Sequence, residues 1–139
     1  MFEQCIYFNL TTLNRQITKL WQEQFDRLGL SPSHGYLLFA MVRNPAISQK
    51  ELGELMELDL STISRFIDTL VHRGLVDKKD KGKGAVMTVT PKGKRVGRQV
   101  SDVMDRLYNQ MKDRFGSKRF EAFVSDLSTA RQSIVETQP

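Results

Sequence analysis

The stretch DLSTISRFIDTLVHR, residues 59–73, decides the fold of this chain. Its apolar residues recur at intervals of three and four, which places them on one face of a helix. They are Leu60, Ile63, Ile67 and Leu70. At about 100° per residue the opposite face is polar. It carries Ser61, Arg65, Asp68 and His72, flanked by Thr62, Ser64 and Thr69. Arginine can bond guanine and a hydroxyl can bond several bases, so this face suits a major groove, although any solvated helix face has a similar composition.

A second short helix is expected directly before this one. Residues 48–51 have the form of a capping box, in which the hydroxyl of Ser48 and the carboxylate of Glu51 each bond an amide at the helix start. Asp59 is the expected N-cap of the following helix, because a carboxylate accepts backbone N–H bonds there. Two short helices joined by so brief a turn predict a helix-turn-helix. The apolar side of the first of them is Leu52, Leu55 and Met56.

A basic hairpin is expected after the helix. Gly74 is suited to the position just beyond a helix end, and residues 75–80 and 85–90 read as two short strands around a glycine-punctuated tip. From Arg73 to Arg95 there are eight lysines and arginines against two aspartates, an excess larger than the +5 of the whole chain. A charge run is often only a solvated face. Beside a helix-turn-helix it is better interpreted as a wing that contacts phosphates or the minor groove.

Three segments together resemble the MarR family of bacterial transcriptional regulators: residues 59–65, 70–76 and 89–93. The resemblance implies a mainly α fold with a small β-hairpin wing, a winged helix-turn-helix set between N- and C-terminal dimerisation helices. It also implies a sequence-specific regulator of double-stranded DNA, a homodimeric repressor on a palindromic operator that a small-molecule ligand or an oxidant relieves. The alternative is a winged-helix protein-interaction module without DNA binding. Many members carry arginine at the wing tip, whereas residues 80–84 offer only lysine, a point charge without the forked geometry.

The expected DNA contacts fall into three groups. The recognition helix would read bases or adjacent phosphates through Ser61, Thr62, Ser64 and Arg65. The backbone register would be fixed by Ser48, Gln49, Lys50 and Arg73. The wing would contribute Lys78, Lys79, Lys81 and Lys83.

The two ends of the chain read as long helices with apolar stripes. The first is expected from about Phe2 to Leu28, the second from Pro91 through Phe115, and the last after a break at Gly116-Ser117. So much apolar stripe indicates cover by a second subunit; an intrachain helical bundle is the alternative. We therefore predict a single domain, 1–139, with a winged lobe at 31–90 and a helical dimerisation lobe made of 1–30 and 91–139.

Between these ends lies a strongly apolar core helix. Ser31 followed by Pro32 gives a cap and a first-turn proline, and Asn44-Pro45 ends the helix. Ala46-Ile47 is expected to be a short extended piece, since a strand there pairs with the wing in the family that the chain resembles.

No enzyme is predicted. The two histidines, His34 and His72, have no companion metal-ligand cluster, and no phosphate-binding glycine loop follows a strand, so no catalytic residue, metal or cofactor is expected. The longest apolar run is far shorter than the roughly 20 residues of a membrane span. One cysteine allows no internal disulfide, which fits the cytoplasm.

Two possible signal sites follow from the resemblance. A small aromatic effector would bind between the winged lobe and the dimer helices, near residues that are otherwise ordinary core: Phe8, Leu13, Trp21, Tyr36, Phe39 and Phe66. A branch of the family senses peroxides through a cysteine near the start of the first helix. Cys5 lies about two residues earlier than that position, a turn of roughly 200°, so we interpret it as a packing or incidental thiol, with a redox sensor as the alternative.

Overall fold

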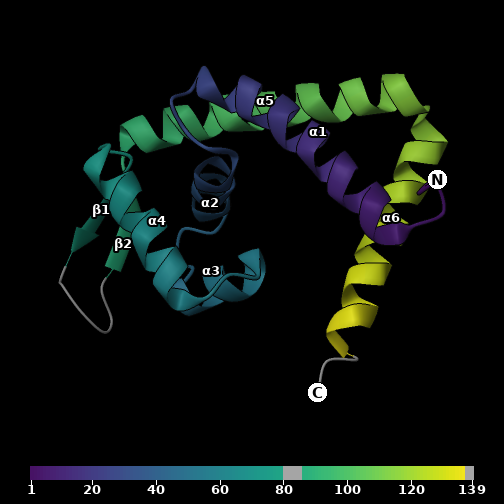
Figure 1. Cartoon of the computed structure of the whole chain (residues 1–139). Coiled ribbons are helices and arrows are strands. Elements are labelled where there is room, and N and C mark those ends of the chain that lie inside the picture. The colour runs from purple at the N-terminus through teal and green to yellow at the C-terminus, as the bar shows by residue number, and fades with distance from the viewer. Residues whose placement is uncertain (80–85, 137–139) are drawn as a thin grey trace. The chain divides into compact units, whose positions relative to one another are not determined.

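The structure is a computed structural model that describes residues 1–79 and 86–136 of the chain. It is mainly helical with one small antiparallel hairpin, as predicted (Figure 1). The elements are α1 (Ile6–Asp26), α2 (Pro32–Arg43), α3 (Gln49–Met56), α4 (Leu60–His72), β1 (Val76–Lys79), β2 (Val86–Val89), α5 (Pro91–Phe115) and α6 (Ser117–Glu136). The chain forms two units, which divide after Val103. The predicted tip of the wing, with Lys81 and Lys83, lies outside the described residues.

The first unit is built around α2, which contacts α1, α3, α4 and β2. Leu37 and Leu38 of α2 are fully buried, and so are Phe25 of α1 and Leu52 of α3. Each fully buried aliphatic side chain contributes roughly 2 kcal/mol of transfer free energy. The apolar character of α2 thus places it at the centre, where the other elements cover it.

The helix-turn-helix forms by the predicted local devices. Glu51 N donates to Ser48 Oγ at 3.1 Å and Ser48 N donates to Glu51 Oε2 at 2.8 Å, which completes the capping box of α3. The helix ends at Glu57, whose φ of 53° lies in the left-handed region. Two residues later Asp59 caps α4, since its Oδ1 accepts the Thr62 amide at 2.8 Å.

The hairpin and α5 are fixed to the end of α4. Gly74, with a φ of 71°, allows the Leu75 amide to donate to Leu70 O at 2.9 Å, so the chain turns directly from α4 into β1. Thr90 then returns to the same place: its amide donates to Leu75 O at 3.0 Å and its hydroxyl to Gly74 O at 2.7 Å. Gly93, in the first turn of α5, sits so close that a Cβ there would lie 2.0 Å from Leu75 O. Only glycine fits this contact.

Two expectations about the fold are wrong. Helix α1 begins at Ile6 rather than near Phe2, because Cys5 N donates to Phe2 O in a turn and Cys5 is the N-cap. Ala46-Ile47 is not a strand: the Ile47 amide donates to Asn44 O at 3.0 Å in a turn, so it is not free to pair with the wing. On the predicted apolar faces, Leu60 and Leu55 are 55% and 58% exposed, since the first turn of α4 and the outer side of α3 extend beyond the core.

In the second unit, α5 continues and α6 follows after Gly116. Leu107 and Met111 continue the stripe of α5 as predicted and are buried. Within this unit the ring of Tyr108 lies edge-on to Phe120, with centroids 5.2 Å apart. The rest of the apolar stripe of α6 is exposed, at Phe123, Val124, Leu127 and Ile134. Among the described residues, no helix combines the length and the apolar character that crossing a membrane requires.

Candidate nucleic-acid interface

Helix α4 has one wholly buried face and one polar face. Ile63, Ile67 and Leu70 are 0% exposed. The side chains at the opposite positions are exposed, as the periodicity predicts: Ser61, Arg65, Asp68, Thr69 and His72. Because the buried face fixes the rotation of the helix, the polar face must point outward.

The outward face begins with a chain of hydrogen bonds in the first turn of α4. Asp59 Oδ1 accepts both the Thr62 amide and the Ser61 hydroxyl, each at 2.8 Å. The bonds from the amide and hydroxyl of Thr62, then from Ser61, hold the pKa of the Asp59 carboxyl below its usual range. Arg65 Nη2 donates to Thr62 Oγ1 at 3.3 Å. The remaining N–H groups of this exposed guanidinium can serve a bidentate contact.

The three DNA contacts predicted at the start of α3 differ in how well they are placed to reach DNA. Lys50 is exposed. The hydroxyl of Ser48 accepts the Glu51 amide but keeps its own proton for a phosphate oxygen. Gln49 is half-buried, and its Nε2 lies 3.9 Å from Met87 Sδ on β2, so this amide side chain is turned toward the hairpin.

The wing pairs in antiparallel register from Val76 opposite Val89 to Lys79 opposite Val86. Successive side chains of a strand point to opposite faces. Accordingly Lys79 is exposed, whereas Lys78 is half-buried opposite Met87. Within the described part of the hairpin, Lys79 is therefore the better placed cation for a phosphate contact.

Arg73 occupies a more structural position than the sequence indicates. A Cβ added to Gly29 would lie 2.5 Å from Arg73 Nη2, so the guanidinium rests on the loop between α1 and α2. The Arg73 carbonyl accepts a bond from Lys92 Nζ at 3.1 Å. Lys92 was not assigned a role from the sequence, since a contact between residues 19 positions apart leaves no local pattern.

His34 lies near Arg73. Its ring packs on Phe66 of α4, with centroids 4.4 Å apart, and its Nδ1 is hydrogen-bonded to the Ser31 hydroxyl. Burial, and then the positive charge of Arg73, lower the pKa of His34 below its usual value. The neutral imidazole is therefore the form that the fold favours.

The residues expected around an effector do not form one group. Trp21 Nε1 donates to the Tyr36 hydroxyl at 3.1 Å, and Phe66 lies on His34. Phe39 is half-buried beneath Arg43, whose guanidinium carbon lies 6.0 Å from the ring centre. Phe8 is exposed and packs with Phe2, about 20 Å along α1 from Trp21 at 1.5 Å per residue. Leu13 is half-buried on α1.

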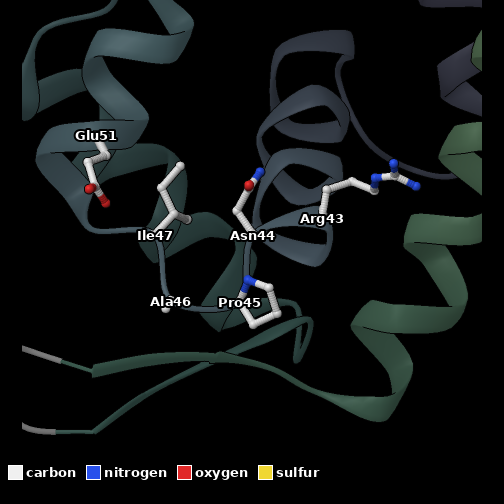
Figure 2. Close-up of a pocket in the computed structure, with 6 residues that line it drawn as sticks. All are labelled: Arg43, Asn44, Pro45, Ala46, Ile47 and Glu51. Carbon is white, nitrogen blue, oxygen red and sulfur yellow. The ribbon is translucent and has the colours of Figure 1, made fainter.

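An open pocket lies elsewhere, where α2 passes into α3 (Figure 2). Its volume is about 500 Å³, and none of the expected effector residues lines it. In Figure 2 the side chain of Arg43 points away from Glu51, so the two charges do not converge on a common ligand position. The lining residues are Arg43, Asn44, Pro45, Ala46, Ile47 and Glu51.

Cys5, the possible redox residue, is a free and exposed thiol. Its Sγ accepts the Phe8 amide at 3.5 Å as the N-cap of α1. This contact gives the side chain a structural role at the helix start.

The environment of His34 predicts how stability depends on pH. The unfolded chain has the higher histidine pKa, so between the two pKa values it binds more protons than the folded chain. The contribution of His34 to the free energy of unfolding is fully present above the pKa of the unfolded chain, about 6.5. It is lost as the pH falls through the pKa of the folded chain. When the pH falls from 7.5 to 5.5, the urea midpoint of the wild type should fall. The midpoint of His34→Gln should fall by less. The exposed His72→Gln is the matched control, and equal losses in all three proteins would contradict the assignment.

The comparisons with known proteins agree with this geometry. Residues 28–84 match the model of the MarR family. The HTH-type transcriptional regulator BilQ of Clostridium symbiosum is 23% identical over 98% of this chain and 94% of its own length. The structure of the transcriptional repressor CouR bound to p-coumaroyl-CoA has a TM-score of 0.84, with 17% identity over 94% of each chain. The S. aureus MepR–DNA complex has a TM-score of 0.82, with 10% identity over 93% of this chain and 97% of that one.

The two solved structures share the fold of this chain, and the matched segment 28–84 contains α2, α3, α4 and β1. Members of the matched family are transcriptional regulators rather than enzymes. Residues 28–84 thus resemble the MarR family, and most of the chain shares the fold of the solved CouR and MepR structures.

Proposed function

We propose that this chain is a homodimeric repressor that binds a palindromic operator and is released from it by a small aromatic ligand. The observation that carries the proposal is the outward face of α4, where exposed Ser61 and Arg65 stand opposite the fully buried Ile63 and Ile67. In helix-turn-helix proteins the second helix lies in the major groove and its N-terminal residues contact base edges. MepR, a protein of the same fold, is in complex with DNA in its crystal structure, and this supports DNA binding by the present chain.

The roles of the contacts follow from their chemistry. Arg65 and the hydroxyls of Ser61, Thr62 and Ser64 would specify bases, because they can bond base edges. Ser48, Lys50, Arg73, Lys78 and Lys79 would bind phosphates, which fixes the position of the protein without reading sequence. Gln49, held near Met87, would link α3 to the wing.

A second subunit is proposed from the uncovered apolar side chains. At the start of the chain Ile6 and Tyr7 are 70% and 77% exposed, and the α6 stripe is exposed as well. A self-complementary contact through such surfaces has two-fold symmetry. It would present two copies of α4 about one duplex turn, roughly 34 Å, apart.

The proposed ligand site is the pair formed by Trp21 and Tyr36. Tyr36 accepts the indole bond and stacks on Phe25, with ring centroids 5.9 Å apart, so its own hydroxyl proton can be donated to a ligand. The structure of CouR with p-coumaroyl-CoA, a phenolic thioester, supports a ligand that carries an aromatic ring. Cys5 is the alternative signal site, as an exposed thiol that an oxidant could reach.

Arg65→Ala tests the reading of sequence. On duplexes selected from the genome that encodes this protein, the variant should lose about 10-fold in affinity for the selected fragment and little for random DNA, because a good base contact contributes about 1–3 kcal/mol of discrimination. Lys79→Ala is the matched control. It should weaken binding to the selected fragment and to random DNA about equally, and it should reduce the salt dependence of binding. Fluorescence anisotropy at two salt concentrations measures both effects. An unchanged specificity ratio in Arg65→Ala would refute the assignment of the reading helix.

Val124→Asp tests the dimer. A carboxylate within the exposed apolar stripe of α6 would be buried without a partner in a dimer, so the variant should sediment as a monomer and bind the selected duplex at least 10-fold more weakly. Thr129→Asp places the same charge on the opposite side of α6 and should remain dimeric. A Val124→Asp protein with the sedimentation coefficient of the wild type would exclude this surface from the interface.

Titration with salicylate and other phenolic acids tests the ligand site. Trp21 is the single tryptophan of the chain, so its emission reports directly on the proposed pair. Binding should change the emission in a saturable way and release the selected duplex over the same concentration range. Tyr36→Phe, which loses the hydroxyl, should weaken both responses together. Release of DNA without any change in Trp21 emission would place the ligand elsewhere.

A further inference from the structure

The first turn of α4 fixes the direction of one hydroxyl proton. Ser61 Oγ lies 2.8 Å from Asp59 Oδ1. An ionised carboxylate only accepts hydrogen bonds, so the serine must donate its single proton to Asp59. The lone pairs of Ser61 remain for an outside group, and the side chain is exposed.

Asp59 is itself held in place by the helix. The oxygen that accepts the Ser61 proton also accepts the Thr62 amide at 2.8 Å, as the N-cap of α4. Its bonds also keep the pKa of this carboxyl below its usual range, so it stays ionised at neutral pH. Asp59 and Ser61 thus form a fixed pair of acceptors at the end of α4 that enters a groove in this motif.

We propose that the Asp59–Ser61 pair selects a base that presents an exocyclic amino group in the major groove. This inference rests on the proposed function, because it requires that α4 contact base edges. The amino groups available there are cytosine N4 and adenine N6, whereas guanine O6 and N7 and thymine O4 are acceptors that the pair repels.

Cytosine is the better match of the two. Adenine places its N7 acceptor beside its amino group, and asparagine or glutamine bonds both because an amide has a donor as well as an acceptor. The Asp59–Ser61 pair has no donor to offer. At one position of the half-site, the edge that faces Ser61 is therefore that of cytosine first and adenine second.

The first experiment is a selection from a randomised duplex library with the full-length protein. The wild type should enrich a motif in which Ser61→Ala relaxes one position and Arg65→Ala relaxes a different one. Failure of the wild type to enrich any motif would refute the proposed function itself. An enriched motif that Ser61→Ala leaves unchanged at every position would refute only the present inference.

The second experiment identifies the group that is read. At the position that Ser61→Ala relaxes, the base is replaced by an analogue that lacks the amino group, 2-pyrimidinone for cytosine or purine for adenine. The wild type should lose about 3- to 10-fold in affinity, as expected for one hydrogen bond, and Ser61→Ala should lose nothing further. A 7-deazapurine on either strand removes an acceptor and should leave the wild type unaffected. A wild-type loss only with the 7-deazapurine would overturn the inference.

Asp59→Asn separates the acceptor pair from the helix cap. The bonds that Asp59 accepts from the Thr62 amide and from the Ser61 hydroxyl end on Oδ1, and asparagine keeps such an oxygen and is an equally good N-cap. The variant should keep the wild-type circular dichroism spectrum and urea midpoint. Because its amide adds a donor and removes the charge, selection should now admit guanine or thymine at the Ser61 position. A motif identical to that of the wild type in a folded Asp59→Asn protein would contradict a role for the carboxylate.

Discussion

The complete burial of one face of α4 is the constraint on which the rest of the first unit depends. Ile63, Ile67 and Leu70 are inaccessible to solvent, and α4 contacts α2, α3 and β1. A helix fixed on three sides cannot rotate about its axis, so the side chains opposite those three have a defined direction. The orientation of Arg65 and Ser61 is thus a result of core packing, and it does not need a bound nucleic acid to establish it.

A second constraint is the junction where α4, β1 and α5 meet. Backbone atoms of Gly74 and Leu75 receive bonds from Thr90, and Gly93 packs against the Leu75 carbonyl without room for a side chain. These contacts join segments about 16 residues apart in the sequence and close the hairpin at its base. The described strands of the wing are therefore anchored to α4 at the end where that helix stops.

The sequence predicted the elements best where the signal is local. Each cap rests on residues no more than five positions apart, so Ser48, Asp59 and Gly74 were identified correctly. Leu60 lies on the predicted apolar face and is still 55% exposed, because periodicity gives the direction of a side chain and not the extent of the core it faces. At the candidate site, the long-range contacts of Arg73 and Gln49 had no sequence pattern and came only from the structure. The contacts proposed with DNA remain predictions.

The two sets of side chains on α4 are disjoint, and this has a consequence for how such a protein can change over evolutionary time. Substitutions on the exposed face, at Arg65 or Asp68, leave the core untouched, and surface substitutions usually change stability by less than about 0.5 kcal/mol. New target preferences could therefore accumulate there with little effect on folding. Asp59 is the exception, because its Oδ1 both caps the N-terminus of α4 and accepts the hydrogen bond that orients Ser61. Drift at this position is limited to residues that still cap a helix.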